Sequence, residues 1–410
     1  MQDGNRTGRR PRRTAVSVIG LTVAAVVLAA CSATPGATGT ANSNAGGGAA
    51  QQAANVKPVA IDIQPAATAA MNPADPVVVK ATNGTLSNVT VTNTVKGTVV
   101  TGDYSTDKST WTSNEHLGYG STYAVNATGA GSDHKAVTQK ATLTTLTATK
   151  TSFPSLIPAP TFVQNTGVGV GQPITVQFDH AVTNKKDVQA ALTVTTVPSQ
   201  PGAWYWISSE QLDYRAQTYW QAGTTITLTA KVYGVNLGGG VYGSTDRTAT
   251  YKVHDALIAK ADGNTEKMQI FDNGTLINTL PISMGKASTP THNGPHVISE
   301  KAQSVQMNSC SYGVCPPDPR AYNETEFWDE RISNSGEYVH ENPATVGAQG
   351  ALNVSHGCIN LSSANAQWFF ARFGIGDVVE VTNSGGPILP IWDRYGDWEI
   401  PWTTWQAGNA

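Results

Sequence analysis

The sequence places a cysteine inside the run Ser355-His356-Gly357-Cys358-Ile359-Asn360, and cysteine is scarce, with four in 410 residues. A thiol attacks carbonyl groups as the thiolate, so a nucleophilic cysteine needs an imidazole that accepts its proton and stabilises the ion pair. A glycine beside the nucleophile lets the backbone approach a substrate and direct N–H groups at a developing oxyanion. The run predicts acyl transfer on Cys358, with the N–H groups of Gly357 and Cys358 as oxyanion donors and Asn360 fixing the turn through its amide.

Two histidines compete for the role of the base. His356 stands two residues before Cys358, so an extended chain would put both side chains on one face of a strand. His340 lies 18 residues upstream of Cys358, in the stretch Tyr338-Val339-His340-Glu341-Asn342-Pro343. The spacing alone does not choose between them.

The hexamer together with a histidine 18 residues earlier resembles the signature of the L,D-transpeptidases, the YkuD-type enzymes that cross-link the bacterial cell wall. The resemblance implies that His340 is the base and that the backbone carbonyl of the next residue, Glu341, orients it. The family often has serine where Glu341 stands, and a backbone role survives that change. His356 is then implied to shape the loop around Cys358.

The resemblance also implies a reaction, acyl transfer on peptidoglycan stem peptides. The Cys358 thiolate would attack the carbonyl of the third residue of a tetrapeptide stem and expel the terminal D-Ala. The side-chain amine of a neighbouring stem would then take the acyl group and form a 3→3 cross-link. Two alternatives stay open, an L,D-carboxypeptidase that uses water as the acceptor and a non-catalytic wall-binding lipoprotein. The family implies no metal or organic cofactor, and it implies carbapenem-type β-lactams as covalent inhibitors.

The stretch from Met307 to Tyr322 is similar to the family's active-site lid. The resemblance implies that Tyr312 and Tyr322 line the acyl-donor cleft, with Tyr322 near the oxyanion. Met307, Ser355 and Asn360 are the other residues expected to contact substrate. The alternative is that the two tyrosines only pack a long loop.

The N-terminus predicts a secretory leader, residues 1–30. Five arginines precede the apolar run Ala15–Ala30, which ends in Leu28-Ala29-Ala30-Cys31. This ending resembles a bacterial lipobox, in which Cys31 is lipidated after cleavage, and a plain signal peptide is the alternative. Lipidation would anchor the exported protein to the outer face of the cytoplasmic membrane without spanning it. Residues 31–57 carry almost no bulky apolar side chains and predict a flexible tether.

Cys310 and Cys315 are the two cysteines left once Cys31 is assigned to a lipid and Cys358 to chemistry. Because exported chains meet oxidising conditions, we expect a disulfide between them. A metal site at this pair would need two more ligands with suitable spacing, and the neighbouring sequence offers none.

The charge pattern excludes several other functions. Net charge is −3, and residues 1–30 hold five arginines and one aspartate, so the chain without them carries −7. No basic patch predicts nucleic acid as a partner. His292 and His296 have the spacing of a zinc-protease helix, but Asn-Gly-Pro between them breaks a helix, so no metal site is predicted. The scattered acids, Asp272 among them, are expected to be solvated.

Short alternating strands punctuated by Gly and Asn fill residues 58–148 and 149–254. An internal repeat links the two stretches: Trp111 before Gly120–Ala127, and Trp206 before Gly223–Ala230. We expect two tandem immunoglobulin-like β-sandwiches, module 1 and module 2. They resemble the paired modules of mycobacterial-type L,D-transpeptidases.

Residues 255–382 are expected to form a mostly-β catalytic domain with one short helix. Asp272-Asn273-Gly274 between alternating stretches predicts a β-hairpin. A serine cap and a terminal glycine predict the helix at Ser363–Phe373. Residues 383–410 would form a C-terminal aromatic subdomain, and its four tryptophans indicate that it packs onto the body: Trp392, Trp398, Trp402 and Trp405.

Overall fold

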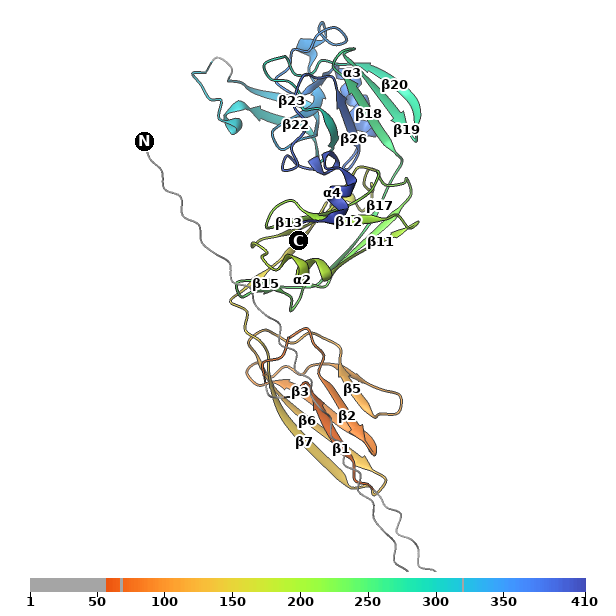
Figure 1. Cartoon of the computed structure of the whole chain (residues 1–410), viewed down its shortest axis with the longest axis vertical. Helices are drawn as coiled ribbons and strands as arrows, with labels where there is room; N and C mark the ends of the chain where they lie inside the picture. The colour runs from red at the N-terminus through yellow and green to blue at the C-terminus, as the bar shows by residue number, and fades with distance from the viewer. Residues whose placement is uncertain (1–56, 67–68, 319–320) are drawn as a thin grey trace, which may run out of the picture. The chain divides into compact units, whose positions relative to one another are not determined.

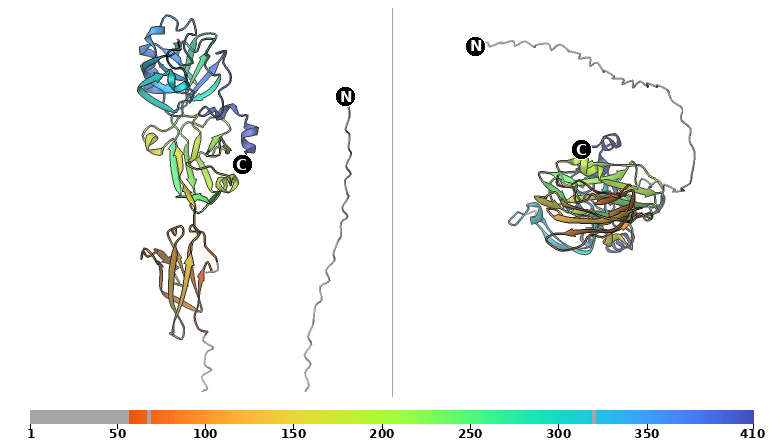
Figure 2. Two further views of the ribbon diagram at one scale, coloured as in Figure 1. Left: turned by 90° about the vertical axis from the view of Figure 1, so that its left-hand side faces the viewer. Right: turned by 90° about the horizontal axis from the view of Figure 1, so that it is seen from below.

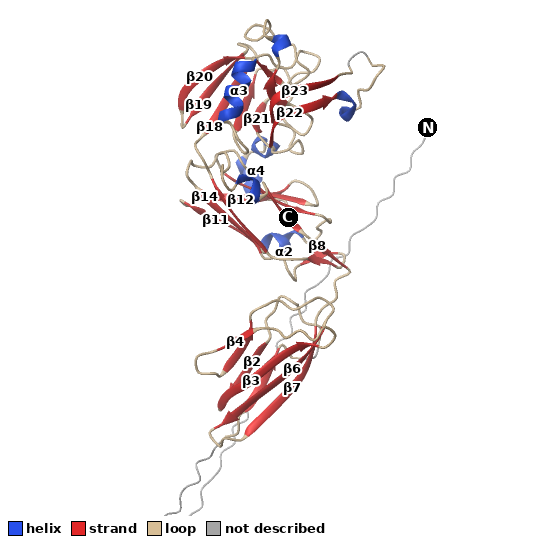
Figure 3. Ribbon diagram, turned by 180° about the vertical axis from the view of Figure 1, so that it is seen from behind, coloured by secondary structure: helices blue, strands red, loops and turns tan. Residues whose placement is uncertain are grey.

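Strands dominate the chain and its helices are short (Figure 3). The computed structural model describes residues 57–66, 69–318 and 321–410, so the leader, Cys31 and nearly all of the tether lie outside the described residues. Within those ranges, no helix has the length and hydropathy needed to cross a membrane. The predicted fold class, two β-sandwich modules before a mostly-β domain with one short α-helix, is confirmed.

Module 1 is a sandwich of two antiparallel sheets, with strand orders β1-β2-β5-β4 and β3-β6-β7 (Figure 1). Every second side chain of β6 is buried, because successive side chains of a strand point to opposite faces. Trp111 on β5 is buried in the same core. The strands are β1 (Ala60–Gln64), β2 (Val78–Thr82), β3 (Gly84–Asn93), β4 (Gly102–Tyr104), β5 (Thr110–Ser113), β6 (Thr122–Gly131) and β7 (Ala136–Thr144).

Module 2 repeats this plan with sheets β12-β13-β10-β9 and β11-β14-β17. Trp206 on β12 is buried, as Trp111 on β5 is in module 1. Strand β14 alternates buried with half-buried side chains, as β6 does in module 1. Its elements are β8 (Lys150–Ser152), β9 (Pro154–Ile157), α1 (Pro160–Val163), β10 (Ile174–Phe178), α2 (Lys185–Ala190), β11 (Leu192–Val197), β12 (Gly202–Trp206), β13 (Gln211–Ala216), β14 (Thr225–Ala230), β15 (Asn236–Gly238), β16 (Val241–Gly243) and β17 (Arg247–Lys252).

The first sheet after residue 254 has the order β20-β19-β18-β26-β21, and it belongs to the domain at the top of the left view of Figure 2. The predicted hairpin is confirmed, because Asp272 pairs with Thr275 across a turn in which Asn273 and Gly274 have φ of 47° and 81°. Its strands are β18 (Leu257–Asp262), β19 (Lys267–Asp272), β20 (Thr275–Pro281), β21 (Gly294–Val297) and β26 (Val378–Thr382).

The second sheet, β22-β23-β24-β25, carries the sequence motif. Its parallel strands β24 and β25 place His340 opposite Asn360, and Cys358 directly precedes β25. The predicted helix is α3 (Ser363–Arg372), whose N-cap Ser362 accepts a hydrogen bond from Asn365 N–H at 3.4 Å. The other elements are β22 (Glu300–Asn308), η1 (Ser309–Tyr312), β23 (Asn323–Arg331), β24 (Tyr338–Glu341), η2 (Pro343–Thr345) and β25 (Ile359–Leu361).

The C-terminal residues pack onto module 2 through η3 (Gly396–Glu399) and α4 (Trp402–Ala407). Trp405 is fully buried, and its indole N–H donates to the Ala203 carbonyl at 2.8 Å. The buried Arg215 guanidinium lies 4.5 to 5.5 Å from three indole rings, a cation–π arrangement. Trp392 is the exception among the four tryptophans, with 67% of its surface exposed.

The expectation that the scattered acids are solvated is wrong. A group of carboxylates is buried: Asp213, Asp329, Glu330, Glu337, Asp377, Asp393 and Asp397. Two causes account for much of this set. The bulge between Phe327 and Glu330 breaks the alternation of β23, and the C-terminal turn brings Asp393 and Asp397 into the interior.

Candidate active site

The turn that carries Cys358 is closed by its own side chains. The Ser355 hydroxyl donates to the Cys358 carbonyl at 2.6 Å and accepts the Gly357 N–H at 3.1 Å. Gly357 has φ of 136°, which L side chains rarely adopt. An added Cβ at Gly357 would lie 3.6 Å from Glu337 Cγ. Ser355 and Gly357 therefore fix the turn from which the thiol projects.

Of the two amides expected to stabilise an oxyanion, the Gly357 N–H is already bonded to Ser355. Among the described residues, nothing accepts the Cys358 N–H. The Asn360 side-chain amide, expected to fix the turn, donates instead to Thr345 Oγ1 at 3.3 Å, and the Asn360 backbone pairs with Ser283. Of these two amides, the geometry leaves the Cys358 N–H free beside the thiol.

His340 is buried and held by two oxygens. Its Nδ1 lies 2.8 Å from the Glu341 carbonyl oxygen and 3.3 Å from Glu326 Oε2, and the ring lines the same cavity as Cys358. Burial opposes the cation, but the hydrogen bonds with Cys358 and Glu326 and their charges outweigh it and raise the pKa of His340 to about 10. The site thus favours an imidazolium beside the sulfur.

His356 has different neighbours. Its Nε2 lies 3.1 Å from Lys286 Nζ, and its ring stacks on Tyr322 with 5.4 Å between centroids. Partial burial and then the positive charge of Lys286 lower the pKa of His356. An imidazole beside an ammonium group is a poor proton acceptor for the thiol.

Two cavities meet at Cys358, and Tyr322 and His356 line both. Cavity A, of about 190 Å³, is lined by Met307, Tyr322, Glu324, Glu326, His340, Asn342, Thr345, Val354, Ser355, His356, Cys358 and Asn360. Cavity B, of about 290 Å³, is lined by Thr289, Pro290, His292, Ser309, Val314, Tyr322, Ser335, Gly336, Glu337, His356 and Cys358. The side chain of Tyr312, which was expected in the cleft, lies outside the described part of the chain.

Cys310 and Cys315 form a disulfide in the loop between β22 and β23. Ser309 connects this loop to Tyr322, because its hydroxyl accepts the Tyr322 N–H at 2.8 Å and donates to the Val314 carbonyl at 2.7 Å. The disulfide loop is therefore coupled by hydrogen bonds to the ring that stacks on His356.

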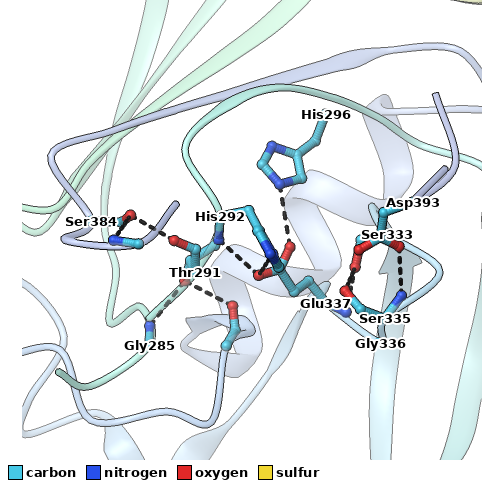
Figure 4. A network of polar contacts seen from close by, with 12 residues as sticks. Gly285, Thr291, His292, His296, Ser333, Ser335, Gly336, Glu337, Ser384 and Asp393 are labelled. Carbon is cyan, nitrogen blue, oxygen red and sulfur yellow. Dashed lines mark hydrogen bonds and ion pairs between the residues drawn. The ribbon is translucent and has the colours of Figure 1, made fainter. Parts of the chain in front are cut away.

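A buried carboxylate beside the site, Glu337, joins two histidines (Figure 4). Its Oε1 lies 3.0 Å from His292 Nδ1 and its Oε2 lies 3.2 Å from His296 Nε2. Burial alone would raise the pKa of Glu337, but the hydrogen bonds from both rings outweigh it and lower that pKa to about 2. Over the described ranges, no group of three or more His, Cys, Asp or Glu side chains is arranged to hold a metal ion.

Sequence reasoning missed Glu326 and Glu337, which contact the rings of His340 and His292. Each acid stands in or beside a strand with no motif around it, and only the fold brings it to a histidine.

The fold and the site define the class of this protein. A family model of the L,D-transpeptidase (YkuD) catalytic domain matches residues 258–381, and one of the bacterial Ig domain matches residues 68–236. The first match contains the run around Cys358 and nearly all residues of the two sheets that follow residue 254.

Most of the chain is similar to L,D-transpeptidase 2 from Mycobacterium tuberculosis (strain CDC 1551 / Oshkosh), with 39% identity over 335 residues, 82% of this chain and 81% of that protein. L,D-transpeptidase 5 of strain ATCC 25618 / H37Rv is 34% identical over 358 residues, 85% of this chain and 77% of that protein. A solved structure of L,D-transpeptidase LdtMt1 in complex with imipenem is 31% identical and covers 56% of this chain and 97% of its own, with a TM-score of 0.49. The chain belongs to the L,D-transpeptidase family.

Proposed function

We propose that this enzyme forms 3→3 cross-links in peptidoglycan by cysteine acyl transfer, with Cys358 as nucleophile and His340 as base. The observation that carries the proposal is that Cys358 and His340 line one cavity, with His340 Nδ1 held by the Glu341 carbonyl at 2.8 Å. A fixed Nδ1 leaves Nε2 for the thiol, which is the arrangement that activates a nucleophile.

In the first half-reaction the Cys358 thiolate attacks the carbonyl of the third residue of a tetrapeptide stem. The oxyanion that forms is stabilised by the free Cys358 N–H. The His340 imidazolium then gives its proton to the departing nitrogen of D-Ala as the C–N bond breaks. A thioester on Cys358 remains.

In the second half-reaction the side-chain amine of a neighbouring stem attacks the thioester and releases the thiolate. Two cavities that meet at Cys358 support transfer between two peptides, because each stem can occupy its own cavity. Hydrolysis by water, the L,D-carboxypeptidase alternative, would need only one.

The leader and the lipobox-like ending at Cys31 support export and anchoring at the outer face of the membrane, where the substrate lies. Both features are read from sequence and lie outside the described residues. In this proposal the tether and the two modules hold the catalytic domain within reach of the wall.

The test uses the chain without residues 1–31, incubated with disaccharide-tetrapeptide and followed by mass spectrometry. We expect a cross-linked dimer with release of D-Ala, and a transient thioester adduct on the peptide that contains Cys358. Tripeptide without dimer would assign the enzyme as a carboxypeptidase. An unmodified Cys358 with full turnover would contradict the mechanism.

A carbapenem supplies an independent readout of the first half-reaction, because its strained carbonyl reacts with the same thiolate. We expect the mass of one carbapenem on the Cys358 peptide. An adduct on Cys310 or Cys315 in its place would contradict the assignment of the nucleophile.

A further inference from the structure

Cys358 has a histidine–glutamate pair on each side. His340 and Glu326 line cavity A, and His292 and Glu337 line cavity B. Neither histidine lines the cavity of the other, whereas Cys358 lines both. The mechanism above uses only the pair in cavity A.

The geometry of the second pair is that of an oriented base. Glu337 Oε1 lies 3.0 Å from His292 Nδ1 and also accepts the His292 backbone N–H at 2.8 Å, so one carboxylate oxygen fixes both ring and chain. His296 Nε2, fully buried, holds the other oxygen at 3.2 Å (Figure 4). His292 keeps 21% of its side chain exposed, and no described residue bonds its Nε2. A carboxylate on Nδ1 sets the tautomer in which Nε2 accepts a proton.

The pair is attached directly to the nucleophile's turn. Thr291, next to His292, donates from its hydroxyl to the Gly357 carbonyl at 2.7 Å. The Gly336 carbonyl, next to Glu337, accepts from the Cys358 thiol at 3.7 Å. Both members of the pair are therefore one residue away from groups that contact Gly357 or Cys358.

We propose that His292, oriented by Glu337, is the general base for the acceptor in the second half-reaction, and that cavity B is the acceptor side. This inference rests on the proposed function. The neutral acceptor amine attacks the thioester carbonyl, the N–C bond forms, and its extra proton passes to His292 Nε2. The C–S bond breaks, the electron pair leaves on Cys358 as thiolate, and the proton on His292 then passes through solvent to His340, which restores the resting thiolate–imidazolium pair.

A separate base answers a geometric difficulty of the site. His340 lines cavity A and not cavity B, so an amine that approaches Cys358 through cavity B meets His292 and not His340. His292 carries one compensating carboxylate and is partly exposed. The charged or titratable groups near His292 are Glu337, Asp393 and His296. Across cavity B lie His356 and Cys358, and Glu399 faces His296. The hydrogen bond with Glu337 and its charge raise the pKa of His292 against the effect of burial.

The first test separates the two half-reactions in His292→Gln. With carbapenem as probe, we expect acylation of Cys358 at the wild-type rate. With disaccharide-tetrapeptide, we expect the thioester enzyme to accumulate in intact-protein mass spectra and dimer formation to fall about 100-fold. Unchanged dimer formation would overturn the proposal, and so would a parallel loss of acylation. Failure of the proposed function would look different, because the wild-type enzyme itself would then form no dimer.

The second test asks whether Glu337 acts through the basicity of His292. In Glu337→Gln the imidazolium loses its carboxylate, so the rising limb of the transfer rate against pH should move to lower pH. A merely structural role would lower the rate at every pH without moving that limb, and that outcome would overturn the proposal. Carbapenem acylation reports whether the variant is folded. The matched control is His180→Gln, which breaks a histidine–aspartate pair of 3.1 Å in module 2 and should change neither half-reaction.

Discussion

His340 and His356, the two imidazoles nearest Cys358 in the motif, lie in opposite electrostatic environments. Both lose some solvation, which disfavours their cations. His340 faces Glu326 and the thiol, so its pKa rises to about 10, whereas His356 faces Lys286, so its pKa falls. In the proposed mechanism the sign of the neighbouring charge, and not nearness in sequence, decides which ring accepts the proton. His356, two residues from Cys358, is the one that the surroundings keep neutral.

The largest effects are expected when the Cys358 thiol or one of the two imidazoles is removed. Cys358→Ala should abolish turnover, and His340→Ala should reduce acylation by about 10²–10⁴-fold, the usual contribution of a positioned base. Stopped-flow acylation by a carbapenem measures the effect, and circular dichroism checks the fold. If His356→Ala were the more damaged variant, the roles of the two rings would have to be exchanged.

A sharper test changes the charge beside His340 and leaves both rings in place. Glu326→Gln removes a hydrogen bond and an anion, so the pKa of His340 should fall from about 10. Acylation needs the His340 imidazolium. The alkaline limb of the acylation rate, plotted against pH, should therefore move to lower pH. A limb that does not move would exclude Glu326 as a partner of His340.

The same raised pKa predicts how stability depends on pH. A group whose pKa rises on folding stabilises the fold fully below its ordinary value, here 6.5, and this contribution is lost as pH rises toward about 10. Thermal melts of the wild type should therefore show a falling midpoint over that window. In Glu326→Gln the fall should end at a lower pH, and identical curves would contradict the link.

A smaller effect is expected on the other side of the comparison. Lys286→Met removes the cation that faces His356, so the pKa of His356 should rise. Acylation near neutral pH should change by less than about tenfold, or 1.4 kcal/mol, because His356 is not the proton acceptor. NMR titration of the His356 ring checks the direction, and a fall in its pKa would contradict the assigned cause.

The smallest global effect concerns the disulfide loop that supports Tyr322 and, through it, His356. Cys310→Ser/Cys315→Ser opens a loop of six residues, for which chain entropy suggests about 2 kcal/mol. We expect slower acylation of Cys358 with little change in the melting temperature. In the chain that lacks Cys31 but keeps Cys310 and Cys315, thiol counting in denaturant should find one reactive thiol, that of Cys358. Three would exclude the bridge.

Local chemistry made parts of this fold predictable. The Asp272-Asn273-Gly274 turn and the Ser362 cap of α3 follow from residues a few positions apart. The carboxylates at the site do not, since the bulge between Phe327 and Glu330 breaks the alternation that would assign faces on β23. Asp329 and Glu330 are both buried as a result. Glu337 meets His292 across 45 residues of chain, a contact that no local pattern encodes.

The C-terminal packing also sets the size of the cooperative folding unit. Val378 of the catalytic sheet belongs to the hydrophobic core of module 2, and Asn409 exchanges two hydrogen bonds with Trp206 at 2.7 and 2.8 Å. Module 2 is thus contacted by the catalytic part at sites far apart in sequence. Loss of the last residues would expose Arg215 and the indole faces that cover it. Module 2 and the catalytic sheets should therefore unfold in one transition, although the sequence divides them at residue 254.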